Sequence, residues 1–118
     1  MLFVVIDRLK LEFVKPDIAL AQITMIKQTF EMYEDLKTQN KLKFVYAFAD
    51  APGGISLWDV ESNEELQRIL FLLPSMPLVE RTVRPVTEVK SISSIIQELE
   101  SIVSSMPKEF DMGNKNDE

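Results

Sequence analysis

Carboxylates dominate the residues of this sequence that could do acid–base chemistry. The 118 residues include 19 aspartates and glutamates but no histidine and no cysteine. Histidine is the side chain that most often moves protons near neutral pH, and cysteine supplies thiolate nucleophiles, disulfides and zinc ligands. Any catalysis by this chain must therefore use carboxylates, lysine, tyrosine or serine.

Three charged residues are the candidate catalytic groups. Asp7 directly follows the apolar run Leu2–Ile6, so it is either a base at the mouth of a barrel or a solvated strand end. The second interpretation is favoured, because charged side chains rarely stay buried without a partner. Glu80 and Arg84 are four residues apart on one side of an expected strand. They form either a substrate clamp or a plain ion pair, and the ion pair is favoured.

The candidates for substrate binding are three aromatic residues, Tyr46, Phe44 and Trp58. The Tyr46 hydroxyl could donate a hydrogen bond to a ligand, but its neighbours Phe44 and Phe48 also suit a subunit interface with a solvated hydroxyl. Trp58 falls at the end of an expected strand, where a tryptophan serves packing more often than ligand contact. Packing is therefore the favoured role for these residues, and ligand binding is the alternative.

Two classes of function follow from these candidates. One is an enzyme that transfers a proton on a small cyclic or carbonyl substrate, with Asp7 or Glu80 as the base. Arg84 or Tyr46 would then be its electrostatic partner. The other class is an oligomeric binding or structural protein without chemistry. Convergence of these four side chains on one pocket would favour the enzyme, and scattered side chains would contradict it.

The segment WDVESNEELQRIL, residues 58–70, contains four carboxylates that have a structural explanation. Ser62 is followed three residues later by Glu65, which is the spacing of a capping box. In that motif the Ser62 hydroxyl accepts from the Glu65 N–H and the Glu65 carboxylate accepts from the Ser62 N–H. Acids in a first helical turn are also stabilised by the helix dipole. We therefore expect this segment to begin a helix rather than to form a catalytic site.

Apolar spacing predicts alternating strands and helices. The expected elements are a strand at 2–6, a helix from 16 to about 38–41, a strand from 42, a turn at 50–54, a strand at 55–60, a helix from 62 to 74, a strand at 78–89 and a final helix. This order predicts an α+β, ferredoxin-like βαββαβ fold with an antiparallel four-stranded sheet and both core helices on one face. We expect residues 1–90 to form this domain, 91–106 an added amphipathic helix and 107–118 a disordered tail.

The second face of the expected sheet has no helix to cover it. In the strand from residue 42, period-two alternation separates two rows of side chains. One row is Leu42, Phe44, Tyr46 and Phe48, and the other is Lys43, Val45, Ala47 and Ala49. Either row is too apolar to face water. Two sheets packed face to face would cover it, so we expect a homo-oligomer, either a dimer or a multiple of one.

The C-terminal helix also needs a cover. Its stripe of seven apolar residues, from Ile92 to Met106, is too extensive to remain in water. A neighbouring subunit or the dimer seam is the favoured cover, and packing over the chain's own helices is the alternative.

Composition limits the other partners. The formal net charge is −6, and the 13 lysines and arginines are scattered. Nucleic acids and anionic membranes need clustered basic residues, so neither is an expected partner. Without a glycine-rich phosphate loop or a cluster of metal ligands, neither a cofactor nor a metal is expected. The initial MLFVVID runs straight into charged residues and no apolar run approaches the ~20 residues of a membrane span, so a cytoplasmic protein is expected.

Three segments of the sequence resemble the muconolactone isomerase family. They are the initial MLF, DLKTQNKL at residues 35–42 and ISLWDVESNEELQRILFLLPSMP at residues 55–77. The similarity runs over residues 1 to 90 and is most specific in the third segment. It implies a dimeric α+β barrel with a small-molecule cleft between the barrel face and a neighbouring subunit. It also implies an enzyme that moves a double bond in a lactone during the breakdown of aromatic rings.

The chain departs from this family at positions that would face a substrate. The family's long helix tends to carry an acidic–basic pair where this chain has Thr29 and Phe30, and its second strand is richer in His, Trp and Arg where this chain has Phe44, Tyr46 and Ala47. The resemblance implies an oligomer with a small-molecule pocket that isomerises a lactone or small carbonyl compound by proton transfer. The alternative is a non-catalytic protein that keeps the fold and lacks the family's catalytic residues.

Overall fold

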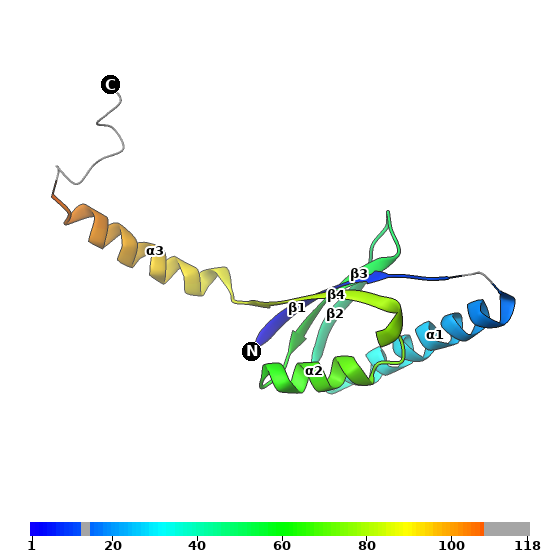
Figure 1. The fold of residues 1–118 in the computed structure, drawn as a ribbon. Helices are drawn as coiled ribbons and strands as arrows, with labels where there is room; N and C mark the ends of the chain where they lie inside the picture. Colours follow the sequence, from blue (N-terminus) through cyan, green and yellow to red (C-terminus); the bar gives the residue numbers. More distant parts are fainter. Residues whose placement is uncertain (13–14, 108–118) are drawn as a thin grey trace, which may run out of the picture. The chain divides into compact units, whose positions relative to one another are not determined.

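A computed structural model describes residues 1–12 and 15–107 of the chain (Figure 1). The chain divides into two compact units, Met1–Val86 and Thr87–Glu118. The unit boundary lies four residues before the boundary at 90 that the sequence suggested. Residues 108–118, which make up nearly all of the expected disordered tail, lie outside the described residues.

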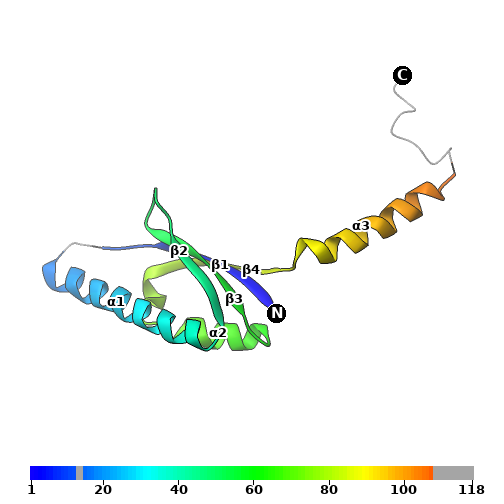
Figure 2. The same cartoon turned by 180° about the vertical axis from the view of Figure 1, so that it is seen from behind.

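The first unit has the predicted α+β order. Its elements are β1 (Leu2–Leu9), α1 (Pro16–Thr38), β2 (Leu42–Ala47), β3 (Gly53–Asp59), α2 (Asn63–Leu72), a short 3-10 helix (Met76–Leu78) and β4 (Val79–Val86). All neighbouring strands are antiparallel, in the order β2-β3-β1-β4. Both views show α1 and α2 on the same face of this sheet, which we call the inner face (Figures 1 and 2). The predicted ferredoxin-like fold is confirmed.

The hydrophobic core lies between the inner face and the two helices. Alternate residues of β1, Phe3 and Val5, are buried there together with Trp58 of β3. Leu66 and Leu70 of α2 pack against them and are almost completely buried. This alternation is what a sheet covered on one side requires, because successive side chains of a strand point to opposite faces.

A β-bulge in β2 overturns the predicted faces of that strand. Leu42 pairs with Trp58, but Phe44 pairs with Leu57, so two residues of β2 oppose one residue of β3. Because of this extra residue, the side chains after it point to the face of the sheet opposite to the one that regular alternation predicts. Leu42 is therefore buried in the core, whereas Phe44 and Tyr46 lie on the outer face, with ring centroids 5.3 Å apart. The prediction that Leu42, Phe44 and Tyr46 share one face was wrong.

Helix α2 begins with the predicted cap, in a modified form. The Glu65 N–H donates to the Ser62 hydroxyl at 3.1 Å, as expected. The Glu65 carboxylate accepts from the Glu61 N–H at 2.8 Å rather than from the N–H of Ser62, so this half of the predicted capping box was wrong by one residue. The same carboxylate forms a 2.8 Å ion pair with Lys41, and the Lys41 hydrogen bond is the main cause that lowers the pKa of Glu65.

The second unit contains α3 (Val89–Ser104). The helix begins two residues before the expected start at 91, and β4 ends three residues before the expected strand end at 89. None of the α3 residues is buried. No helix in the part of the chain that the structure describes is long and apolar enough to cross a membrane.

The Ser62 cap gives the first testable prediction. Ser62→Ala removes the side-chain acceptor for the Glu65 N–H and is expected to lower the free energy of unfolding by about 1 kcal/mol. Urea unfolding followed by the fluorescence of Trp58, the single tryptophan, would measure the loss. Ser93→Ala, an exposed serine on α3, is the control and should change the value by less than about 0.5 kcal/mol. Equal stabilities for the two variants would contradict the capping role.

Candidate functional site

A cavity of about 290 Å³ lies between α1 and the inner face of the sheet. Its volume is near the lower end of the range of small-molecule sites, roughly 300 Å³. Most of its wall is apolar, including Ile26 and Phe30 of α1 and Val45 of β2. The polar residues on its wall are Asp7, Thr29, Tyr33, Tyr46, Ser56 and Ser75. An apolar cavity with a few polar groups is the usual form of a ligand-binding site.

Two glycines shape the end of the cavity formed by the β2–β3 hairpin. Gly53 has a φ of 146°, and a Cβ added there would collide with the carbonyl oxygen of Asp7. A Cβ on Gly54 would lie 2.6 Å from the carbonyl oxygen of Tyr46. The sequence predicted a turn from these glycines. The structure adds that they allow β3 to approach β1 and β2 closely beside Asp7.

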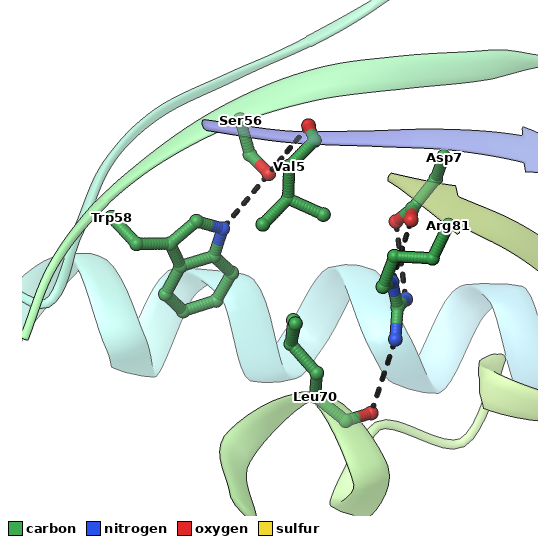
Figure 3. A network of polar contacts seen from close by, with 6 residues as sticks. All are labelled: Val5, Asp7, Ser56, Trp58, Leu70 and Arg81. Atoms are coloured by element: carbon green, nitrogen blue, oxygen red, sulfur yellow. Dashed lines mark hydrogen bonds and ion pairs between the residues drawn. The ribbon is translucent and has the colours of Figure 1, made fainter. Parts of the chain in front are cut away.

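Asp7 is held on the cavity wall by Arg81 of the neighbouring strand β4 (Figure 3). The Arg81 Nε donates to Oδ1 of Asp7 at 2.6 Å and Nη2 donates to Oδ2 at 3.1 Å. Nη1 of the same guanidinium lies 3.4 Å from the Leu70 carbonyl of α2. Only 14–15% of either side chain is exposed. Asp7 is thus a largely buried, bidentate partner of arginine, and its interpretation as a solvated strand end was wrong.

Tyr33 is the residue on the cavity wall that sequence reasoning missed. The pKa of its hydroxyl is raised to about 12, mainly by burial and secondly by the charge of Asp7, while Arg81 partly opposes the rise. The hydroxyl is therefore protonated at neutral pH and can donate a hydrogen bond to a ligand. Thr29 lies one helical turn earlier on the same face of α1, as expected from the four-residue spacing. That spacing of two hydroxyl residues within the apolar stripe was the available signal.

Other hydroxyl groups of the wall are used to hold the structure together. The Ser75 N–H donates to the Thr29 hydroxyl at 2.9 Å, which ties the connection after α2 to α1. The Trp58 indole donates to the Ser56 hydroxyl at 2.9 Å, and this hydroxyl reaches the Val5 carbonyl at 3.4 Å (Figure 3). Trp58 therefore supports the wall from the core and is only 1% exposed. This geometry favours its packing role.

The remaining predicted catalytic residues lie on the outer face of the sheet. Glu80 pairs with Lys10 at 3.0 Å and with Arg8 at 3.9 Å, and the Lys10 hydrogen bond is the main cause that lowers the pKa of Glu80. The expected ion pair between Glu80 and Arg84 was wrong. Arg84 is exposed and stands opposite Val4 of β1.

The four side chains proposed for one pocket therefore do not converge. Asp7 points to the inner face, while Glu80 and Arg84 belong to the outer face because they alternate with Arg81 along β4. Tyr46 contributes to the rim of the cavity, but its side chain is 66% exposed and lies beside Phe44 on the outer face. The groups that lie near Asp7 are instead Arg81 and Tyr33.

No group of three or more carboxylates lies close enough together to hold a metal ion in residues 1–12 and 15–107.

The fold defines the structural class of this protein. It is a small α+β protein with a ferredoxin-like sheet, two helices on one face and an apolar cavity beneath α1. Comparison with known families gives the particular member of this class. The family model described as muconolactone delta-isomerase matches residues 1–91, so the chain belongs to that family. The resemblance found in the sequence is confirmed.

Two individual proteins illustrate this relationship. The muconolactone delta-isomerase of Acinetobacter baylyi (strain ATCC 33305 / BD413 / ADP1) is 37% identical over 60 residues, which cover 50% of this chain and 62% of the relative. The aligned region thus spans less than two thirds of that enzyme. A crystal structure of muconolactone isomerase superposes with a TM-score of 0.67 at 24% identity, covering 75% of this chain and 90% of that one. This second match supports the fold.

The raised pKa of Tyr33 gives the second prediction. A pKa of about 12 in the folded protein, against an ordinary value of 10.0, means that folding stability is fully present below pH 10 and is lost as pH rises towards 12. The loss should reach about 2 to 3 kcal/mol. A spectrophotometric titration of tyrosinate should show one tyrosine that ionises only near pH 12.

Two variants assign this titration. Tyr33→Phe should remove the late ionisation and reduce the loss of stability at alkaline pH. Tyr46→Phe, which changes the other tyrosine of the chain, should leave both unchanged. The assignment fails if the late ionisation persists in Tyr33→Phe.

Proposed function

We propose that this protein binds a small lactone or other small carbonyl compound in the cavity beneath α1 and isomerises it by proton transfer. The observation that carries the proposal is the position of Asp7, a carboxylate on the wall of an otherwise apolar cavity. Membership in the muconolactone delta-isomerase family supports the reaction class. The scattering of Asp7, Tyr46, Glu80 and Arg84 contradicts an enzyme built on those four groups. The proposal therefore keeps only Asp7 from that set, as the base, and takes Tyr33 of the cavity wall as its partner.

The geometry supplies the two groups that such a reaction needs. Asp7 takes a proton from the carbon next to the carbonyl, and the electron pair of the broken C–H bond moves onto the carbonyl oxygen. The protonated hydroxyl of Tyr33 stabilises that oxygen by donating a hydrogen bond. Asp7 then returns the proton to a different carbon, which moves the double bond. No oxidant, reductant or cofactor takes part, because the atoms and electrons balance within the substrate.

Arg81 has a positioning role in this proposal. Its two hydrogen bonds fix the plane of the Asp7 carboxylate, and each oxygen keeps a lone pair outside the ion pair. The guanidinium is itself anchored by the Leu70 carbonyl. The base is thus held in one orientation towards the cavity before a substrate binds, which lowers the entropic cost of reaching a reactive geometry.

A second candidate is a binding protein without chemistry. It is favoured by the same ion pair, because Arg81 already donates a hydrogen bond to each oxygen of Asp7, which leaves fewer lone pairs of the carboxylate for a substrate. The residues Thr29, Phe30 and Ala47, where the family resemblance implied charged or polar groups, also give the cavity few groups for chemistry. Under this alternative the cavity binds a ligand, and the Asp7–Arg81 pair serves recognition and stability.

Self-association is part of the proposal. The outer face of the first unit exposes apolar and aromatic side chains, including Ile6 at 38% and Tyr46 at 66%. Faces of this kind are normally covered in soluble proteins. We expect two copies to pack with these faces together, so that the protein is a homo-oligomer whose cavities lie on the helix side of each sheet.

Replacement of the base gives the third prediction. Asp7→Asn keeps the shape of the side chain but removes the proton acceptor. It should lower the rate of isotope exchange at the carbon next to the carbonyl by about 10²- to 10⁴-fold. Exchange in deuterated water can be followed by NMR with lactones that stabilise the protein in a thermal-shift screen. Glu80→Gln is the matched control on the outer face and should exchange at the wild-type rate.

The possible results separate the two candidates. If the Asp7→Asn variant exchanged the isotope at the rate of the wild-type protein, Asp7 would be excluded as the base. Ligand binding by the wild-type protein without any exchange would contradict the enzyme and favour the binding protein.

A further inference from the structure

The apolar residues of α3 repeat every seven residues. Spacings of three and four alternate along the helix, which is the pattern of a helix that packs lengthwise against another helix. Two series of three residues each form this apolar seam, and all six side chains are exposed, from 40% for Met106 to 80% for Val89. The first series is Val89, Ile96 and Val103. The second series is Ile92 and Leu99 of α3, continued by Met106 two residues after the helix ends.

A third apolar row widens the seam on one side only. Ile95 and Ile102 each precede a residue of the first series and are 50% and 52% exposed. The other side of the seam carries Ser93 and Glu100, and the far face carries serines, Gln97 and Glu98. A face of three apolar positions in seven is typical of a helix inside a bundle. The short helix would be marginal by itself in water, so its packing partner contributes to its order.

We propose that α3 packs antiparallel against α3 of a second copy of this chain. In this arrangement every residue of the first series lies opposite a residue of the second series, so the seam is complementary to itself. No charged residue lies in this seam. The register pairs Val89 with the partner's Met106, Ile92 with the partner's Val103 and Ile96 with the partner's Leu99.

The side rows favour the antiparallel over the parallel orientation. Antiparallel packing places Ile95 beside the partner's Ile102 and leaves Ser93 beside the partner's Glu100, so apolar groups meet apolar groups and polar groups meet polar groups. Parallel packing would place Ile95 beside the partner's Glu100, which would remove water from a carboxylate without giving it a partner.

The length of α3 indicates how much this contact can contribute. Sixteen residues span about 24 Å, and a helix is about 10 Å wide, so the contact covers roughly 240 Å² on each copy. A specific interface buries about 800 Å² on each partner. The helix pair therefore adds to another contact between copies, which raises the effective concentration of the two helices. This inference rests on the proposed self-association of the first units, but it does not depend on the proposed chemistry.

Cross-linking of the full-length protein tests the register. The chain contains no cysteine, so introduced cysteines are the only thiols present. The double variant Ile92→Cys/Val103→Cys should form disulfide-linked dimers under mild oxidation, because antiparallel packing brings these positions together between copies. Each single variant should cross-link several-fold less. The control is Ser94→Cys/Ser101→Cys, which has the same symmetry about the helix centre but lies on the polar face.

Each cross-linking result has a defined meaning. Preferential cross-linking of the seam pair supports the proposal. Efficient cross-linking of Ile92→Cys alone would show parallel packing and overturn the register. Equal cross-linking of the seam and control pairs, or none by either, would show that α3 is covered by something else, such as the chain's own first unit.

Self-association provides a second measurement. Ile96→Asp puts a charge into the middle of the seam and should raise the dissociation constant of the oligomer at least about tenfold in sedimentation experiments. Gln97→Asp adds the same charge to the neighbouring polar position and should leave the constant unchanged. Trp58 fluorescence would verify that the first unit stays folded in both variants. Equal dissociation constants for wild type and Ile96→Asp would overturn the proposal.

Discussion

The ion pair between Asp7 and Arg81 is the interaction on which the first unit depends. It joins β1 to β4 on the inner face of the sheet and reaches α2 through the Leu70 carbonyl. Burial of two charges is costly, and a buried pair that loses one member is destabilised by about 3–5 kcal/mol. Well-packed apolar residues can often replace such a pair without loss of stability. The pair also acts on its surroundings, because the charge of Asp7 contributes to the raised pKa of Tyr33 and that of Arg81 partly opposes it.

The sequence predicted the order of the elements because local patterns determine it. The positions of Ser62 and of the glycine-containing turn mark where helices and strands begin and end, and the structure has a cap and a hairpin there. Hydrophobic alternation also identified the strands. The faces of β2 could not be predicted, because a single bulged residue reverses the phase of all the residues after it.

The partners of charged residues were beyond sequence reasoning for a related reason. Glu80 pairs with Lys10 and Asp7 pairs with Arg81 because of the register between β1 and β4, which is set by tertiary packing. A four-residue spacing along one strand placed Glu80 near Arg84 in sequence but gave no contact between them. Tyr33 was overlooked because its position in an apolar stripe is also that of an ordinary core residue, and only the cavity distinguishes the two roles.

The bulge in β2 also affects the tendency of the sheet to aggregate through its edges. The strand order makes β2 and β4 the two edges, and an open edge is a template for joining other chains into fibrils. The irregular spacing of β2 disturbs its hydrogen-bond ladder, and Pro85 removes one donor from β4. Both features disfavour edge-to-edge aggregation, in which further chains add strands to the sheet. The proposed packing of two outer faces would not depend on these edges.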